Sequence, residues 1–234
     1  MTCFKPVLAA LFVLLAAALV TVSPAVAQFD DPCRNPLELP VVEIDVEART
    51  ERTSARFTAE ELHRYAHDTD PLPVGYRHFG FTEMLREIRT SARVRSGTDD
   101  YKNFCYSPET ITVSIKVAPV IYVPGEYPRT SCPAGAVRVH EQLHLQLHEE
   151  ALRELPDRIR QALRLERDLR ITKKARDRRD AINRVKELSL QVALRAAHEL
   201  DEEYRVRHLE LDSPSSYRAN LGICGEAEWA GLMD

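Results

Sequence analysis

The strongest chemical signal in the sequence is the segment His140-Glu141-Gln142-Leu143-His144. Four residues make about one helical turn, so both histidines lie on one helix face and can share a Zn²⁺ ion. Glu141 stands beside them, where it can serve as a general base for a water on the metal. The pattern therefore predicts a zinc-dependent hydrolase in which His140 and His144 bind the metal and Glu141 is catalytic.

A catalytic zinc site takes three protein ligands, so a third residue is needed. His148 lies on the same face, but about 12 Å along the axis from the first histidine, so we expect it to support the ligands or to pack. If the next helix returns antiparallel, positions around residue 200 lie opposite the motif. There Glu199 and Glu203 share an apolar stripe, where a carboxylate is costly unless it is paired or bound to metal. Glu199 is the expected third ligand and Glu203 the second choice.

Two other interpretations of these residues stay open. The histidines could be core side chains that are satisfied by hydrogen bonds, without any metal. The two glutamates could form buried ion pairs, or the apolar stripe could already reach solvent near the end of the helix.

The first 27 residues carry the pattern of an export signal. Lys5 is their only charged residue, an almost unbroken apolar run extends from Val7 to Val22, and Ala25-Val26-Ala27 is a small-residue cleavage site. The run is only marginally long enough for an uncleaved membrane anchor, which is the rival interpretation. We expect residues 1–27 to be removed and residues 28–234 to form one secreted or periplasmic domain.

Export to an oxidising compartment changes how the cysteines are interpreted. Cys33, Cys105, Cys132 and Cys224 remain after cleavage, and their even number predicts two disulfide bonds. Three pairings are possible. The strand-like segment between Cys105 and Cys132 weakly favours that pair, with Cys33–Cys224 joining the two ends. A four-cysteine zinc site is less favoured because no C-x-x-C pair occurs.

The mature chain changes character near residue 133. Before it, residues 28–132 contain alternating or β-branched runs that predict strands: Val41 to Val46, Ile88 to Val94 and Ile111 to Val123. One short helix is expected between them, from Thr58 to His67, because Thr58 and Glu61 have the spacing of a capping box.

The second half, residues 133–234, has helical periodicity from Gly135 almost to Arg207, with one turn expected around Arg170 to Lys174. The predicted class is therefore α+β. We expect a small N-terminal antiparallel or mixed sheet with one short helix, followed by a long C-terminal helical hairpin that carries the H-E-x-x-H motif.

Composition limits the function classes. The chain has 234 residues, of which 44% are hydrophobic and 29% charged, so it can bury a core and is not intrinsically disordered. No apolar run after the leader approaches the roughly 20 residues that span a bilayer. Residues 28–234 carry 31 Lys and Arg against 36 Asp and Glu, a balance that gives no support for nucleic-acid binding.

The helical half contains one basic region. Residues 153–187 carry 13 Lys and Arg against 7 Asp and Glu. This region could bind an anionic partner such as lipid head groups or an acidic polymer. The mixed signs favour a plainer interpretation, which is a solvated helix face with i,i+4 ion pairs.

Several features after residue 120 occur together in one group of proteins. They are Val120-Ile121-Tyr122-Val123, Cys132 just before the motif helix, the H-E-x-x-H motif itself, and the late segment Leu211 to Tyr217 with Cys224. In these features the chain resembles uncharacterised secreted bacterial proteins that are predicted to be zinc-dependent proteases of a minimal zincin-like type. The resemblance implies a sheet before the zinc helix, a bound Zn²⁺ and a peptide or protein substrate.

The sequence departs from that group in one respect and from the metzincins in another. Some of the similar proteins have a late His-Gly that could be a ligand, whereas no histidine follows His208 here. No Gly-x-x-His extension follows His144, which excludes the metzincin ligand pattern.

Three functions compete at this point. The first is a secreted zinc metallopeptidase. The second is a non-catalytic, disulfide-stapled envelope protein with a structural or degenerate zinc site and a partner-binding helical hairpin. The third is hydrolysis of an amide bond in a cell-wall peptide, which would use the same site as proteolysis.

Overall fold

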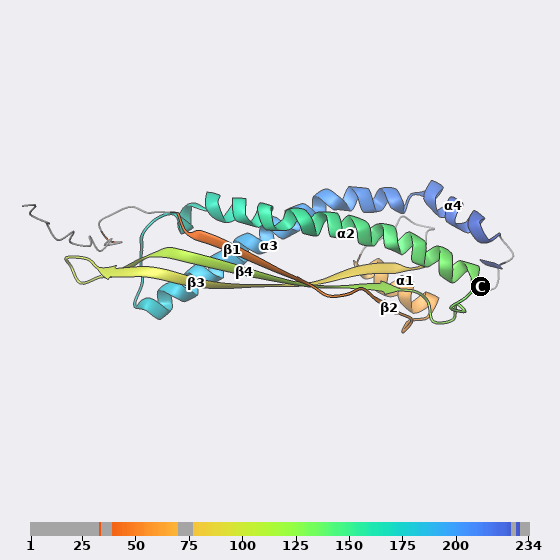
Figure 1. Cartoon of the computed structure of the whole chain (residues 1–234), viewed down its shortest axis with the longest axis horizontal. Helices are drawn as coiled ribbons and strands as arrows, with labels where there is room; N and C mark the ends of the chain where they lie inside the picture. The colour runs from red at the N-terminus through yellow and green to blue at the C-terminus, as the bar shows by residue number, and fades with distance from the viewer. Residues whose placement is uncertain (1–32, 34–38, 70–76, 226–227, 230–234) are drawn as a thin grey trace, which may run out of the picture. The chain divides into compact units, whose positions relative to one another are not determined.

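The structure is a computed structural model, and it describes residue 33 and residues 39–69, 77–225 and 228–229 (Figure 1). The predicted export signal lies outside the described residues. Residues 31–234 form one compact unit. Within the described ranges, no helix is both long enough and apolar enough to cross a membrane.

A five-stranded mixed sheet is the first layer of the fold. Its strands are β1 (Val41–Ala48), β2 (Arg52–Ser54), β3 (Phe81–Thr98), β4 (Phe104–Tyr122) and β5 (Lys173–Lys174). Strands β1 and β2 pair with β4 in parallel, whereas β3 and β5 pair with it antiparallel. The predicted α+β class and mixed sheet are confirmed, but β3 and β4 are longer than the predicted strands, and β5 comes from the helical half.

Alternation along β4 shows which face of the sheet is covered. Ile111, Val113 and Ile115 are fully buried in the main core, as period-two alternation requires of a strand with one covered face. Their neighbours are polar: the Thr112 hydroxyl donates to Glu43, and Lys116 pairs with Glu47. These polar residues lie on the opposite face of the sheet.

Four α-helices lie in the part of the chain that the structure describes. They are α1 (Ala59–Thr69), α2 (Cys132–Leu165), α3 (Arg178–Leu211) and α4 (Pro214–Cys224). The predicted capping box of α1 is confirmed, because the backbone N–H of Thr58 donates to the Glu61 carboxylate at 2.9 Å and the Glu61 N–H donates to the Thr58 hydroxyl at 3.2 Å. Leu62 of α1 packs on Val120 and Tyr122, so near its end β4 is covered on both faces.

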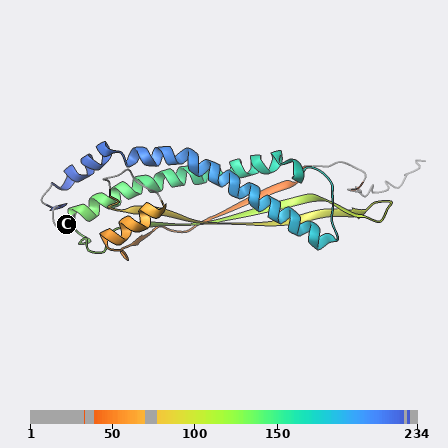
Figure 2. The same ribbon diagram turned by 180° about the vertical axis from the view of Figure 1, so that it is seen from behind.

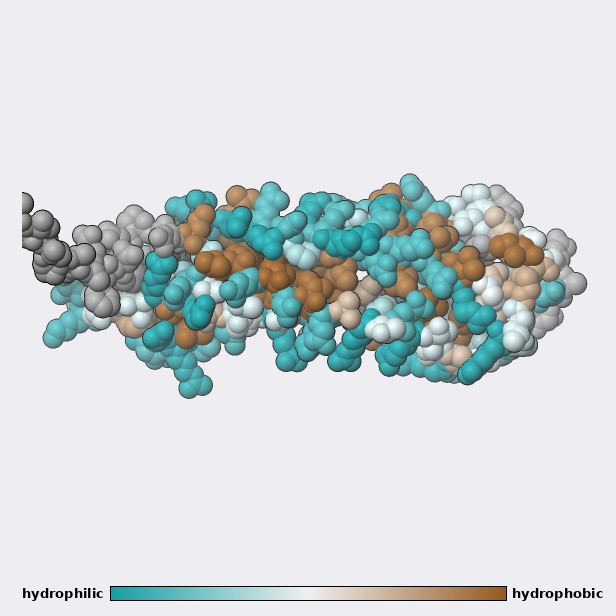
Figure 3. Space-filling view, viewed as in Figure 1, coloured by the Kyte–Doolittle hydropathy of each residue, from teal (hydrophilic) through white to brown (hydrophobic). Residues whose placement is uncertain are grey.

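Helices α2 and α3 lie against one face of the sheet, and α1 lies on the other side (Figures 1 and 2). The core between them contains Leu155, Ile159 and Leu163 of α2 together with Val185 and Val192 of α3. Figure 3 shows hydrophilic side chains over the outer surface of α2 and a band of apolar side chains between α2 and β1.

The helical hairpin is confirmed, but its two arms are not in the expected register. Glu166, at the end of α2, pairs with Arg195 at 3.6 Å, so the preceding turns of α3 lie beyond the end of α2. The connection is longer than a simple turn, since it contains a 3₁₀ turn, η1 (Arg167–Leu169), and strand β5. As a result, Glu203 and Tyr204 face Arg158 and Glu154 rather than the H-E-x-x-H motif.

Two disulfide bonds are present, as predicted, but the favoured pairing was wrong. Cys33 is bonded to Cys105 and Cys132 to Cys224. Cys105 lies at the start of β4, and Cys132 follows the end of that strand. An extended chain rises about 3.3 Å per residue, so the length of β4 keeps these two cysteines far apart. Cys33–Cys105 therefore holds the N-terminal segment to the start of β4, whereas Cys132–Cys224 joins the beginning of α2 to the end of α4.

Candidate metal centre

The two histidines of the motif lie near the beginning of α2. Ser131 is the N-cap of this helix, and its hydroxyl accepts a hydrogen bond from the N–H of Ala134 at 3.3 Å; Pro133 lies in the first turn. His140 and His144 are only 8% and 7% exposed. Their Nε2 atoms are 3.2 Å apart, as expected for imidazoles one turn apart on one face.

Asp212 places a carboxylate oxygen beside the two histidines, where it could act as a third metal ligand. Its Oδ1 lies 2.9 Å from Nε2 of His140 and 3.2 Å from Nε2 of His144. Tetrahedral zinc with bonds of about 2.0–2.1 Å holds its ligand atoms roughly 3.3 Å apart. The three atoms thus have the spacing of three corners of a zinc tetrahedron, and their chemistry of two imidazoles and one carboxylate suits Zn²⁺. No other group of this kind lies among the described residues.

The junction between α3 and α4 places Asp212. This residue caps the C-terminal end of α3, and the next residue, Ser213, caps α4 by accepting a hydrogen bond from the Ser216 N–H. The Cys132–Cys224 disulfide then ties the end of α4 to the beginning of α2. The junction is held over the first turns of α2, which brings the carboxylate to the two histidines.

The prediction that Glu199 or Glu203 faces inward was wrong. Both residues are exposed, and Glu203 pairs with Arg158 at 2.6 Å. The buried face of α3 runs instead through Ala197, Leu200 and Tyr204. The shifted register of the hairpin explains the difference, because it brings the end of α3 to the motif.

Glu141 is held by the beginning of β3. The carboxylate is buried, with the residue 4% exposed, and the Thr82 hydroxyl donates to its Oε2 at 2.8 Å. Gly80 leaves room for it, because a Cβ at that position would lie 2.6 Å from Oε1 of Glu141. Burial raises the pKa of Glu141, against the opposing influence of His144 and His140. The residue is therefore poised to hold a proton more readily than an exposed glutamate does.

Two further histidines, His208 and His148, lie next to the cluster on the side of His144. Nδ1 of His208 lies 2.8 Å from Nδ1 of His144, and the ring centroids of His208 and His148 are 4.5 Å apart. Burial lowers the pKa of His208 to about 3 and that of His148 to about 4. Neutral His208 can accept the Nδ1–H that His144 must carry when its Nε2 binds a metal, so it can fix the orientation of that ligand.

Asp212 is held as a carboxylate. Burial alone would raise its pKa, but hydrogen bonds from His140 and His144 lower it well below the usual value. The anion is the form that a metal ligand requires.

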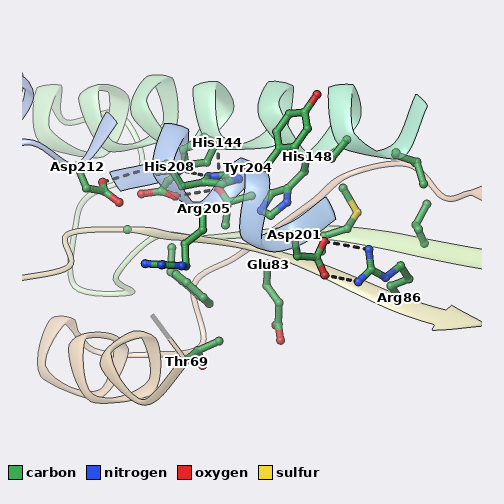
Figure 4. Close-up of a pocket in the computed structure, with 18 of the residues that line it drawn as sticks. Thr69, Glu83, Arg86, His144, His148, Asp201, Tyr204, Arg205, His208 and Asp212 are labelled. Carbon is green, nitrogen blue, oxygen red and sulfur yellow. Dashed lines mark hydrogen bonds and ion pairs between the residues drawn. The ribbon is translucent and has the colours of Figure 1, made fainter. Parts of the chain in front are cut away.

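A pocket of about 430 Å³ opens onto the cluster and is lined by Glu141, His144, His208 and Asp212 among others (Figure 4). Arg86 of β3 and Asp201 of α3 form a two-point ion pair in the same pocket, at 3.1 and 2.5 Å. A cavity of this size falls within the range of small-molecule and peptide side-chain sites.

Comparison with known proteins does not assign the site, because no protein family model, curated protein or solved structure matches this chain. The likeness to predicted zinc-dependent proteases thus rests on the sequence features alone.

Sequence reasoning missed Asp212, Thr82, Gly80 and His208. One signal for Asp212 was available, since Ser213-Pro214 is a helix-start pair and marks a break in the helical run directly after this aspartate. No local pattern identifies Gly80 or Thr82, because their roles depend on the contact between β3 and α2.

Proposed function

We propose that this protein is a secreted or periplasmic zinc-dependent metallopeptidase, with His140, His144 and Asp212 as metal ligands. The observation that supports this most strongly is the convergence of three ligand atoms within 3.2 Å of one another beside a buried glutamate, at the wall of a pocket. Two disulfide bonds among the described residues are in keeping with an exported protein.

The bound zinc would act as a Lewis acid that polarises a peptide carbonyl and makes a water molecule more acidic. Glu141 is the general base. It takes a proton from the attacking water and delivers it to the leaving amine, a role that its raised pKa favours. Thr82 and Gly80 position the Glu141 carboxylate, and His208 orients His144.

Both apolar and charged residues line the pocket. Phe81, Met84 and Leu152 give it apolar walls, and the Arg86–Asp201 ion pair gives it a polar one. Such a lining suits a peptide chain, which presents both kinds of group. A cell-wall peptide would use the same catalytic residues, so the proposal covers hydrolysis of peptide amide bonds in both settings.

The test combines metal content with hydrolysis. The protein, purified with its disulfides intact and dialysed against trace zinc, is expected to hold one zinc per chain and to cleave a library of quenched fluorescent peptides. Glu141→Gln should retain the zinc and lose activity by about 10²–10⁴-fold, because it removes the proton acceptor but keeps the ligands. His144→Ala should lose both.

Other results would contradict the proposal. A protein that binds no zinc is not a metallopeptidase of this kind. A protein that binds zinc but hydrolyses neither the library nor cell-wall peptides would be the non-catalytic envelope protein with a structural metal site.

A further inference from the structure

The connection between α2 and α3 carries a concentration of positive charge that the described residues do not neutralise. Residues 164–179, which we call the basic pole, contain eight Lys and Arg against three Asp and Glu. Five of these cations are exposed arginines that have no acidic partner among the described residues. They are Arg164, Arg167, Arg170, Arg178 and Arg179.

Each acidic residue of the basic pole already has a partner, and none of these partners is one of the five arginines. Glu166 pairs with Arg195, Asp168 with Lys173, and the Asp177 side chain caps α3 by accepting from the Asp180 N–H. The excess positive charge therefore does not come from cations that are already paired with acidic side chains. It belongs to side chains that point into solvent.

The position of two of these arginines argues that they do not serve to stabilise the fold. Arg178 and Arg179 occupy the first turn of α3. The N-terminal end of a helix carries partial positive charge, so cations there are unfavourable. Asp177 at the N-cap and Asp180 in the same turn offset part of this repulsion, and an anionic partner outside the molecule would relieve the rest.

Apolar side chains are exposed at the same place. Leu165 is 66% exposed and Ile171 is 39% exposed, both within the basic pole. The neighbouring β3–β4 turn presents Tyr101, which is 88% exposed, and the Lys174–Asp99 ion pair links that turn to β5. Exposed apolar residues among arginines are typical of a surface that enters the head-group region of a membrane, whereas a soluble polyanion needs only the charge.

The covalent structure brings the N-terminal part of the chain to this end. Cys33 is bonded to Cys105, and Cys105 lies opposite Lys174 in the β4–β5 pair. The Cys33–Cys105 disulfide therefore lies at the same end of β4 as the basic pole.

From these observations we propose that the basic pole docks on the surface of an anionic phospholipid bilayer. The five arginines contact lipid phosphates, while Leu165, Ile171 and Tyr101 insert between head groups. His144 and Leu165 lie on the same helix, 21 residues apart. At about 1.5 Å per residue the metal cluster is roughly 30 Å from the docking surface along α2, so docking leaves the pocket open.

The test measures partition onto vesicles. Protein expressed with its own leader and purified from the periplasm is mixed with vesicles of phosphatidylcholine, with or without phosphatidylglycerol, at low and high salt. We expect binding to the anionic vesicles alone, and weaker binding at high salt. Replacing Arg167, Arg170 and Arg178 by Gln should lower the partition coefficient about 100-fold, at roughly fivefold per cation near the surface.

A matched control changes the charge equally at other places. Arg49, Arg64 and Arg153 are exposed and lie outside the basic pole, and their triple replacement by Gln should leave partition unchanged. The double variant Leu165→Ser/Ile171→Ser should lose the binding that remains at high salt. Circular dichroism checks that each variant is folded.

Three results would overturn the proposal: no binding to anionic vesicles at low salt, equal loss in the two triple variants, or tighter binding to soluble polyglutamate than to vesicles. The last result would identify an acidic polymer as the partner instead. Zinc content and peptide hydrolysis should not change in any of these variants, so failure of membrane docking is distinguishable from failure of the proposed enzymatic function.

Discussion

The two ends of α2 differ in whether their charged residues are buried or exposed. Near its beginning, Glu141, His140 and His144 are less than 9% exposed, and each has a hydrogen-bond partner. In its last turn and beyond it, five arginines are exposed, with no acidic partner among the residues described. Burial makes charges interact strongly with one another, whereas exposure leaves them available to an outside partner. One end is therefore suited to holding an ion and the other to meeting an anionic surface.

The largest expected difference concerns the choice of ligand. Asp212→Ala should weaken zinc binding by at least about 10³-fold, because it removes one of three ligands, whereas Glu199→Ala should have no effect because Glu199 is exposed. Zinc affinity is measured by competition with a chromogenic chelator. Equal affinities in Asp212→Ala and the unaltered protein would show that the carboxylate is not a ligand.

The two disulfides allow the two ends to be perturbed separately. They close loops of similar length, with sequence separations of 72 and 92, so removing either should destabilise the protein by a similar amount, about 2–5 kcal/mol. Only Cys132→Ser/Cys224→Ser should also weaken zinc binding, by about 10- to 100-fold, because α4 no longer fixes Asp212. Chemical denaturation and the chelator competition measure the two effects. Weaker zinc binding in Cys33→Ser/Cys105→Ser would contradict the separation of the ends.

Acid should destabilise the metal end through His148, which is packed near Arg86, His144 and His208. Its pKa is about 4 in the folded protein and about 6.5 when unfolded, so between these values the unfolded chain binds a proton that the folded one does not. His148 alone should lower the free energy of unfolding of the metal-free protein by on the order of 2 kcal/mol as pH decreases from 6.5 to 4, and His208, whose pKa is about 3, should add to this loss.

His148→Gln should remove part of this pH dependence, and replacing the exposed His198 by Gln should not. Urea unfolding at a series of pH values measures it. An unchanged slope in His148→Gln would show that other groups cause the acid sensitivity.

The smallest expected effect comes from a single methyl group. Gly80→Ala should displace the Glu141 carboxylate and lower the hydrolysis rate by about tenfold, with zinc retained. Gly135→Ala is the matched control, since a Cβ there meets nothing within 4 Å, and it should stabilise α2 by up to about 1 kcal/mol. Steady-state kinetics on a peptide substrate compares them. A fully active Gly80→Ala would mean that Glu141 tolerates the displacement or is not the base.

Sequence patterns correctly predicted those elements whose structure depends on interactions between residues close in sequence. The capping box of α1, the alternation of β4 and the helix around His140 and His144 all follow from contacts within a few residues. The register of the hairpin could not be predicted in this way. The register depends on the connection through η1 and β5, and β5 is placed by its pairing with β4. Because of this register, Asp212 rather than Glu199 lies beside the two histidines.

The pairing of the cysteines was missed for a related reason. The strand-like segment between Cys105 and Cys132 favoured that pair, but β4 is extended over its whole length. A strand separates its ends far more than a helix of equal residue count does, so the correct pairing required the length of the strand to be known.

The place of Asp212 along the chain has a consequence for the proposed site. Asp212 follows His140 by 72 residues, and its position is fixed by a disulfide that forms only when Cys132 and Cys224 are oxidised. Under the proposed function, a chain with these two cysteines reduced would hold zinc less tightly and hydrolyse peptides more slowly. Formation of one disulfide would thus act on the site without changing any of its three proposed ligands.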